Sequence, residues 1–279
     1  MPEASEPILR FDDVSVAFDD LTVLSHVSFA AGEGESRIIL GAAGSGKTVL
    51  LKTALGLVRP ASGKVYVFGK DISRMREREL SDVRSKIGML FQESALFDSL
   101  TIEENVAYPL QNHKAIQCPS KEIHSRVEQA LNFVELGGTL EKFPSELSGG
   151  MRRRAAIARA VVTNPPLILY DSPTAGLDPI TAYTIMALLI KERDVAGTTT
   201  LVVTYRYQDG DLMAKFRYNS DKGGLEPARN GDKPEVGTTF MVLKEGSVVF
   251  EGDQEHLEAS EDPYVQKFVK PREPSNGAH

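Results

Sequence analysis

The sequence lacks the features that secreted or membrane-spanning chains usually carry. It has one cysteine, Cys118, so no disulfide can form within the chain and nothing indicates an oxidising compartment. The apolar run at residues 185–190 is only six residues long, whereas a membrane span needs about 20. The first six residues are acidic and have no apolar core, so we expect no signal peptide. Composition therefore disfavours a secreted, fibrous or membrane-spanning chain.

Positive charge is also scarce. The 32 lysines and arginines are outnumbered by 39 aspartates and glutamates, which gives a formal net charge of −7. This balance disfavours broad, sequence-independent binding to nucleic acid or anionic lipid, although it leaves room for a local basic patch. The five histidines show no metal-ligand spacing. With 279 residues, the chain has room for about two domains, or for one large domain with an inserted lobe.

Strand-sized apolar runs alternate with helix-like stretches along most of the chain. Strands are predicted at residues 8–18, 24–30, 38–40, 65–68, 87–91, 167–170 and 199–203, and a hairpin at 241–243 and 248–250. Helices are predicted at residues 48–58, 74–86, 179–195 and 254–270. This alternation predicts an α/β fold with helices on the faces of a sheet.

The block at residues 98–150 differs because it has almost no strand signal. Thr101, with Glu104 three residues later, forms a capping-box signature for a helix start. We therefore predict a first core segment at 7–97, an inserted helical lobe at 98–150 and a second core segment at 151–270. Residues 208–237 are polar and rich in glycine, which predicts a loop insertion, and 271–279 are predicted to be a disordered tail.

Residues 41–48 match the pattern G-x-x-x-x-G-K-[ST] between a predicted strand and a predicted helix. Glycines in such a loop let backbone N–H groups point at phosphate oxygens, and the helix N-terminus adds positive potential. Lys47 would reach the β- and γ-phosphates, and the Thr48 hydroxyl would bind Mg²⁺. The predicted nucleotide-binding residues are Gly41, Gly44, Ser45, Gly46, Lys47 and Thr48. The competing interpretation is a glycine-rich turn with an incidental lysine.

A second metal ligand is expected at the end of an apolar strand. The run at residues 167–170 ends at Asp171, and ligands of open α/β sheets bind at the carboxyl ends of the strands. Asp171 is therefore a predicted Mg²⁺ ligand. The competing interpretation is a helix-capping aspartate before Pro173.

A third motif lies about 100 residues after the phosphate loop: Leu147, Ser148, Gly149, Gly150 and Met151. Together with the phosphate loop, it resembles the ATP-binding cassette (ABC) ATPases, and the resemblance extends over about residues 11–252. It implies a P-loop NTPase core with an inserted helical subdomain and an N-terminal antiparallel β subdomain. It also implies a head-to-tail dimer, in which each ATP lies between one phosphate loop and the partner's signature motif.

The same resemblance implies roles for three further residues. Gln92 matches the loop that senses γ-phosphate and metal and faces a membrane partner, so it joins the predicted metal ligands. Asp178 matches the end of the family's D-loop. Phe18 is a candidate for stacking on adenine, with an ordinary strand-end residue as the alternative.

Several stretches look like the ATPase of Mla-type transporters, which drives lipid-transport complexes that contain MCE proteins. They are residues 89–92, 95–97, 105–110, 144–151, 153–156 and 177–180. The resemblance implies phospholipid transport at a bacterial inner membrane, or at a related organelle, with this chain on the cytoplasmic face. The sequence has no span of its own, so an integral-membrane permease must supply the path, alongside an MCE lipid-binding protein.

Two residues depart from the family pattern at the chemical centre. Ser172 stands where the catalytic glutamate should follow Asp171, and Tyr205 stands where a switch histidine should follow Thr204. A serine hydroxyl without an activating partner is a poor base near neutral pH. Tyrosine can donate a hydrogen bond to the γ-phosphate but titrates near 10 rather than 6.5.

Three interpretations follow from these departures. In the first, the chain still hydrolyses ATP, because positioning and electrostatics supply most phosphoryl-transfer catalysis. Its catalytic set is Lys47, Gln92, Asp171, Ser172 and Tyr205, with Glu93 either replacing the missing carboxylate or lying in solvent. In the second, the chain binds ATP and dimerises as a regulatory subunit with very slow hydrolysis. In the third, it forms a heterodimer with an intact ATPase.

Other features leave alternatives open. Arg152, Arg153 and Arg154 are interpreted as the polar face of the signature helix rather than as a basic patch. Tyr264 and Phe268, four residues apart, either dock on a neighbouring subunit or pack on their own domain. Outside transport, the alternative is a soluble cassette ATPase of DNA repair or the ribosome, but the acidic balance gives nucleic acid little to bind.

Overall fold

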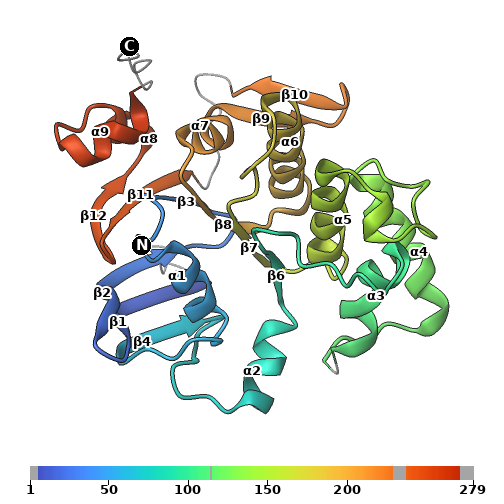
Figure 1. Cartoon of the computed structure of the whole chain (residues 1–279), viewed down its shortest axis with the longest axis horizontal. Coiled ribbons are helices and arrows are strands. Elements are labelled where there is room, and N and C mark those ends of the chain that lie inside the picture. The colour runs from blue at the N-terminus through green and yellow to red at the C-terminus, as the bar shows by residue number, and fades with distance from the viewer. Residues whose placement is uncertain (1–5, 114, 229–236, 271–279) are drawn as a thin grey trace, which may run out of the picture.

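The computed structural model describes residues 6–113, 115–228 and 237–270. Its centre is a six-stranded sheet with the strand order β12-β11-β3-β8-β7-β6, in which only the edge strand β12 runs antiparallel to its neighbour (Figure 1). In chain order these strands are β3 Ser36–Leu40, β6 Ile87–Leu90, β7 Leu167–Asp171, β8 Thr199–Thr204, β11 Thr238–Lys244 and β12 Ser247–Gly252. Every residue of β3, β7 and β8 is buried, as expected for parallel strands covered on both faces.

A second, antiparallel sheet lies beside the first and has the order β2-β1-β4-β5. Its strands are β1 Leu9–Phe18, β2 Leu21–Ala31, β4 Ser62–Val67 and β5 Lys70–Asp71. Helix α1, Lys47–Ala54, contributes Leu50 and Leu51 to an apolar cluster that also contains Val16, Ile39 and Leu169, and so joins the two sheets. The helix ends earlier than predicted because the chain turns at Gly56, where φ is +64°.

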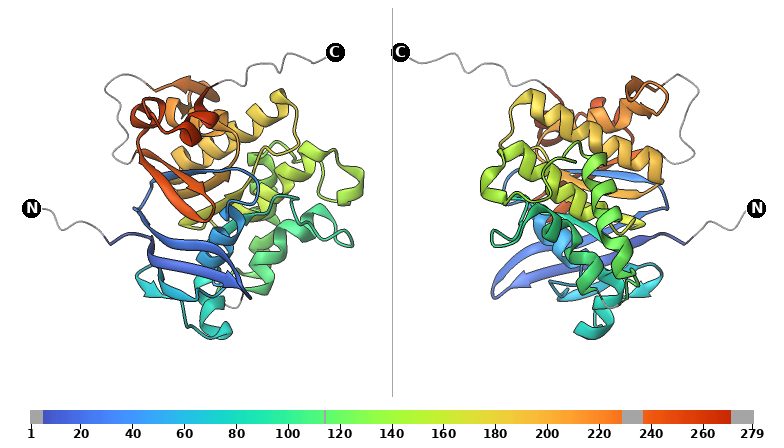
Figure 2. Two further views of the ribbon diagram at one scale, coloured as in Figure 1. Left: turned by 60° about the vertical axis from the view of Figure 1, so that its left-hand side comes forward. Right: turned by 90° about the vertical axis from the view of Figure 1, so that its right-hand side faces the viewer.

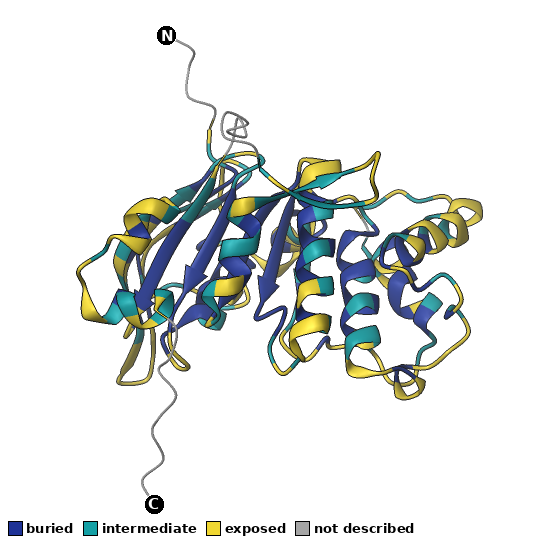
Figure 3. Ribbon diagram, turned by 90° about the horizontal axis from the view of Figure 1, so that it is seen from above, coloured by how far each residue is buried: buried dark blue, intermediate teal, exposed yellow. Residues whose placement is uncertain are grey.

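The helical part of the chain packs on the opposite side of the central sheet (Figure 3). It comprises α3 Ile102–Asn112, α4 Ser120–Phe133, the 3-10 turn η1 Pro144–Glu146 and α5 Gly149–Val161, and the solvated helix α2 Glu77–Arg84 precedes it. The capping box is present, since Thr101 Oγ1 accepts from Glu104 N at 3.2 Å and Glu104 Oε2 accepts from Thr101 N at 2.7 Å. Helix α5 crosses the boundary predicted at residue 150 without interruption.

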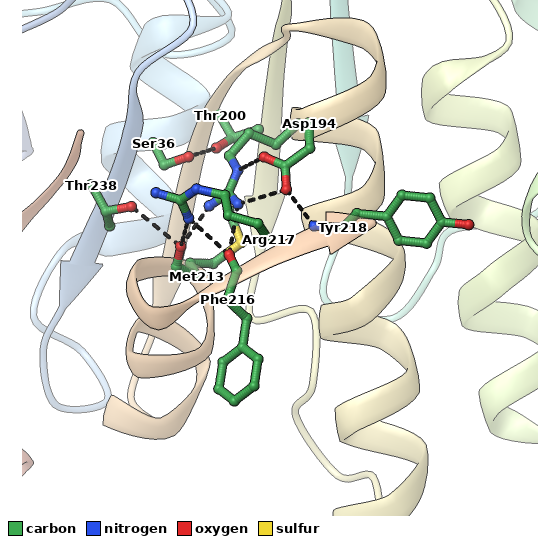
Figure 4. Close-up of polar contacts among 9 residues, drawn as sticks. Ser36, Asp194, Thr200, Met213, Phe216, Arg217, Tyr218 and Thr238 are labelled. Atoms are coloured by element: carbon green, nitrogen blue, oxygen red, sulfur yellow. Dashed lines mark hydrogen bonds and ion pairs between the residues drawn. The ribbon is translucent and has the colours of Figure 1, made fainter. Parts of the chain in front are cut away.

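The prediction of a loop after β8 is wrong for the described part of residues 208–237. The chain forms α7 Tyr207–Lys215 and then a hairpin of β9 Phe216–Asn219 and β10 Gly224–Pro227, next to α6 Pro179–Ala196. Arg193 of α6 donates to Met213 O at 2.5 Å and to Phe216 O at 2.9 Å, and Asp194 accepts from Tyr218 N at 2.7 Å (Figure 4). Side chains of α6 therefore hold this polar segment in place, and residues 229–236 lie outside the described residues.

The C-terminal elements return to the edge of the central sheet. The β11–β12 hairpin is as predicted, and it is followed by α8 Gln254–Glu258 and α9 Pro263–Val269 beside it (Figure 2). The predicted tail at 271–279 lies outside the described residues. Within the described ranges, no helix is both long enough and apolar enough to cross a membrane.

Candidate nucleotide site

The loop after β3 has the backbone geometry that a phosphate cradle needs. Gly44 and Gly46 adopt φ of +77° and +100°, which residues with a Cβ rarely reach. A Cβ at Gly46 would lie 2.8 Å from Val23 O, whereas one at Gly44 would meet nothing within 4 Å. Gly46 therefore fits against the N-terminal sheet, and Gly44 leaves its backbone open to a ligand.

Lys47 lies inside this loop. Its Nζ donates to Gly41 O at 2.8 Å, to Ala42 O at 2.7 Å and to Ser45 Oγ at 3.3 Å. Burial lowers the pKa of Lys47 to about 8, and the nearby charge of Asp171 opposes that shift. The ammonium group is thus held among oxygen atoms, and a phosphate would give it a stronger partner than these carbonyls.

Thr48 and Asp171 meet across the sheet as the sequence predicts. Asp171 ends β7 and is buried, and its Oδ2 accepts from Thr48 Oγ1 at 2.9 Å. A hydroxyl and a carboxylate side by side match the oxygen ligands that Mg²⁺ prefers. The two side chains therefore fit a magnesium ion that accompanies bound nucleotide.

A single cavity of about 1280 Å³ opens at this edge of the sheet. Lys47, Thr48, Gln92, Ser172 and Tyr205 all line it. They come together because β3, β8, β7 and β6 are consecutive parallel strands, so the loops after these strands lie at one edge of the sheet.

Three comparisons with known proteins bear on this site. The profile of the family "ABC transporter" matches residues 24–175, more than half of the chain. This chain belongs to the ABC transporter family. The intermembrane phospholipid transport system ATP-binding protein MlaF of Escherichia coli K12 is 33% identical over 272 residues, which cover 96% of this chain and 91% of that protein.

Other relatives support the same assignment. The probable ribonucleotide transport ATP-binding protein mkl of Mycobacterium tuberculosis H37Rv is 33% identical over 264 residues, covering 95% of this chain and 67% of that protein. A solved dimeric ATP-binding cassette in a post-hydrolysis state, bound to ADP and Pi, superposes with a TM-score of 0.74. It is 31% identical and covers 88% of this chain and 98% of its own. The predicted ABC fold and the likeness to Mla-type ATPases are confirmed, and the chain is an ATP-binding subunit of this family.

The ABC signature motif lies away from the phosphate cavity of its own chain. Ser148 is the N-cap of α5 and accepts from Met151 N at 3.2 Å, and the neighbouring Gly149 has open space beside it. A Cβ at Gly150 would lie 2.7 Å from Thr181 Cγ2. Among the described residues that line the cavity, Ser148, Gly149 and Gly150 do not occur, so a single chain does not bring both phosphate-binding motifs together.

Asp178 and Phe18 also lie outside the lining of this cavity, within the described chain. Asp178 caps α6, accepting from Ile180 N and Thr181 N at 3.0 Å each. Its pKa is lowered, chiefly by the hydrogen bond from the Thr181 hydroxyl. Phe18 ends β1 and is 48% exposed, and its stacking on adenine stays a prediction.

The two departures from the ABC pattern differ in environment. Ser172 is buried at φ of +49°, and its Oγ donates to Asp171 Oδ1 at 3.2 Å. Tyr205 is 51% exposed. Glu93 is exposed and is not among the described residues that line the cavity, so this geometry gives little support to Glu93 as a replacement for the missing carboxylate.

Sequence reasoning missed a buried carboxylate behind the site. Asp209, which is 1% exposed, accepts from Thr174 Oγ1 at 2.9 and 2.7 Å and from Thr204 Oγ1 at 2.7 Å. Burial raises the pKa of Asp209, while the two hydroxyls and the charge of Arg206 oppose this. Asp209 thus ties the loop after Ser172 to the residue before Tyr205. It lies in the segment that resembled a loop, and no motif marks it.

Helix α9 supplies further residues that the sequence did not assign to the cavity. Tyr264 Oη accepts from Ala42 N and donates to Leu243 O, both at 3.3 Å. Tyr264, Lys267 and Phe268 line the cavity together with the phosphate loop. Tyr264 and Phe268 pack partly buried against the core of their own domain, and docking on a neighbouring subunit stays a prediction.

Proposed function

We propose that this chain is the ATP-hydrolysing subunit of a transporter that moves phospholipid through a membrane permease, in complex with an MCE lipid-binding protein. The observation that carries the enzymatic part is the shared cavity, which is lined by Lys47, Thr48, Gln92, Ser172 and Tyr205, with Asp171 hydrogen-bonded to Thr48 and Ser172 beside it. The phospholipid part draws support from the likeness to MlaF. The relative mkl is equally similar, and its name assigns it to probable ribonucleotide transport. Sequence identity alone therefore does not distinguish phospholipid from ribonucleotide as the transported substrate.

The residues of the cavity divide the work of phosphoryl transfer. The phosphate-loop amides and Lys47 would bind and orient the phosphates, and Thr48 and Asp171 would hold a Mg²⁺ ion, which would supply charge neutralisation at the phosphates. Gln92 and Tyr205 reach the same space as donors that can orient a water or a γ-phosphate oxygen. Positioning of this kind supplies most of the rate enhancement in phosphoryl transfer.

Ser172 supports an alternative function, in which the chain binds ATP but hydrolyses it very slowly. Its hydroxyl already donates to Asp171, and no described carboxylate in the cavity lining is free to act as a base. An ATP-binding subunit with very slow hydrolysis, alone or paired with an intact ATPase, therefore remains the alternative function.

A head-to-tail dimer would complete the site. Ser148 and the exposed glycine beside it form the N-terminus of α5, where backbone N–H groups attract a phosphate. Because this surface lies outside the cavity of its own chain, we propose that it faces the nucleotide of a second subunit. The dimeric arrangement of the solved ADP-bound cassette supports this.

The permease would dock next to the Gln92 loop. Phe97 and Tyr108 are 43% and 39% exposed, and their rings lie 4.7 Å apart. An exposed aromatic pair of this kind suits a protein interface. This placement would set the chain at the cytoplasmic face of a bacterial inner membrane as a peripheral subunit, and nothing in its acidic balance favours nucleic acid as a partner.

Steady-state ATP hydrolysis tests the enzymatic part. The purified chain with its permease should hydrolyse ATP at least about tenfold faster than the Lys47→Ala variant, because the variant loses the ammonium group that binds the phosphates. Equal rates would overturn hydrolysis. Nucleotide binding without turnover by the unmodified chain would then establish the regulatory alternative.

A further inference from the structure

Three consecutive arginines follow the signature motif, and the structure gives each a different partner. Arg152 is exposed and donates to Leu147 O at 2.9 Å. Arg154 is half-buried and donates to Val134 O at 3.1 Å, within the helical lobe. Only Arg153 of the three is buried, with 6% of its surface exposed. The sequence pattern predicts that all three arginines lie on one polar face of the signature helix. That prediction is wrong for Arg153, which is buried.

Arg153 reaches two loops of the nucleotide site. Its Nη1 donates to Phe91 O at 3.2 Å and, through a shorter contact, to Gln92 O. Its Nη2 donates to Ala175 O at 3.4 Å, on the loop between Ser172 and α6. A planar guanidinium can hold several carbonyls in fixed directions, which the single ammonium group of lysine cannot do.

The backbone next to Gln92 needs such support. Ser94 and Ala95 have φ of +66° and +48°, a left-handed conformation that costs non-glycine residues free energy. Arg159, also on α5, donates to Ser94 O at 2.8 Å and to Ala95 O at 2.7 Å. Two arginines of the signature helix thus hold this strained loop, and only Arg153 also holds the loop after Ser172.

We infer that Arg153 is a positioning residue that fixes the Gln92 side chain against the γ-phosphate and ties that position to the signature helix. This inference rests on the proposed function of the cavity. The hydrogen bonds of Arg153 within the described residues go to Phe91, Gln92 and Ala175, outside the phosphate loop, so it should act on the terminal phosphate and on turnover rather than on nucleotide binding as a whole. A helix that contacts the partner's nucleotide would in this way be linked to the residue that senses its own.

The test compares Arg153→Gln with Arg153→Lys and with the matched control Arg154→Gln in the full chain. Three kinds of measurement are made on each protein. They are steady-state kinetics, which give kcat and KM for MgATP, competition with a fluorescent nucleotide, which gives the affinities for ATP and ADP, and thermal unfolding, which gives Tm. We expect Arg153→Gln to lower kcat by about ten- to hundredfold, as a small misplacement of a reacting group does. The preference for ATP over ADP should fall with it, while ADP affinity stays within about twofold. Arg153→Lys should recover part of both losses, and Arg154→Gln should behave like the unmodified chain.

The binding measurement separates this inference from the proposed function. If the unmodified chain hydrolyses no ATP, hydrolysis is overturned, and the ratio of ATP to ADP affinities still tests Arg153. The inference is overturned if Arg153→Gln keeps both the kcat and that ratio of Arg154→Gln. It is also overturned if ATP affinity, ADP affinity and Tm all fall together, because that pattern marks a merely structural role.

Discussion

The two halves of the nucleotide cavity are built in different ways. The phosphate-loop half comes from one continuous strand, loop and helix, and its proposed phosphate ligands are backbone amides and the buried Lys47. The half that we propose to face the terminal phosphate gathers side chains from the ends of three strands, β6, β7 and β8. Local backbone geometry fixes the first half, whereas the second depends on hydrogen bonds between separate loops.

The two departures from the family pattern lie in only one of these halves. Ser172 and Tyr205 both lie in the second half, and the phosphate-loop pattern is intact. Substitutions in the second half should therefore change turnover more than nucleotide binding. Asp171 is the most demanding test, because it bonds to Thr48 of the first half and to Ser172 of the second.

The largest effect is expected for Asp171→Asn. The amide keeps the size of the carboxylate but removes its negative charge, so Mg²⁺ loses a charged ligand and ATP hydrolysis should fall by about 100-fold or more. The affinity for ATP without Mg²⁺ should change little. Parallel assays with Mg²⁺ and with EDTA would check this, with the exposed Asp221→Asn as the control. Unchanged hydrolysis in Asp171→Asn would mean that the two halves do not share a metal.

The first half was readable from the sequence because its signals are contiguous. Lys47 and Thr48 follow from one motif, and Asp171 follows from its place after an apolar run. The meeting of Gln92, Ser172 and Tyr205 was also predictable, although only through the family resemblance. It requires β6, β7 and β8 to be parallel neighbours, and that order is a property of the whole sheet.

The supporting contacts could not be predicted. Arg153 is chemically identical to its two neighbours, and only the rotation of α5 against the core decides which arginine is buried. The β9–β10 hairpin is held by hydrogen bonds to Arg193 and Asp194 of α6 as well as by Phe216, Tyr218 and Leu225, which are only partly buried against the core. Long-range contacts of this kind leave no local pattern in a sequence.

A gain of function is expected when Ser172 is replaced by a carboxylate, which tests whether the second half of the cavity lacks a general base. Ser172→Glu places a carboxylate beside Asp171. Because Ser172 lines the cavity of about 1280 Å³, the longer side chain has room to extend into it. A positioned general base contributes about 10²–10⁴-fold, so we expect kcat to rise at least about tenfold while ATP affinity stays nearly constant. Ser172→Gln is the matched control for size. Equal rates in the two variants would show that a base at this position is not what limits turnover.

The smallest effect is expected at Asp209, which supports the second half without touching it. Oδ2 of Asp209 accepts from both Thr174 and Thr204, so an asparagine amide oxygen in its place would keep these two bonds and lose the bond from Thr174 to Oδ1. A neutral hydrogen bond contributes about 0.5–1.5 kcal/mol, so Asp209→Asn should lower kcat by about two- to tenfold. Asp211→Asn, on the same helix but bonded to Lys215, is the control.

The pH dependence of stability provides a second test of Asp209. Burial raises the pKa of Asp209 above its ordinary value of 3.8, so upward from that pH the folded chain keeps a proton that the unfolded chain has released. The stability contributed by the protonated carboxyl is complete below 3.8 and is lost as pH rises through the folded pKa. Raising the pH toward neutrality should therefore shift the difference in Tm between the unmodified chain and Asp209→Asn in favour of Asp209→Asn. A difference in Tm that stays constant with pH would mean that Asp209 ionises equally in the folded and unfolded states, and would contradict this prediction.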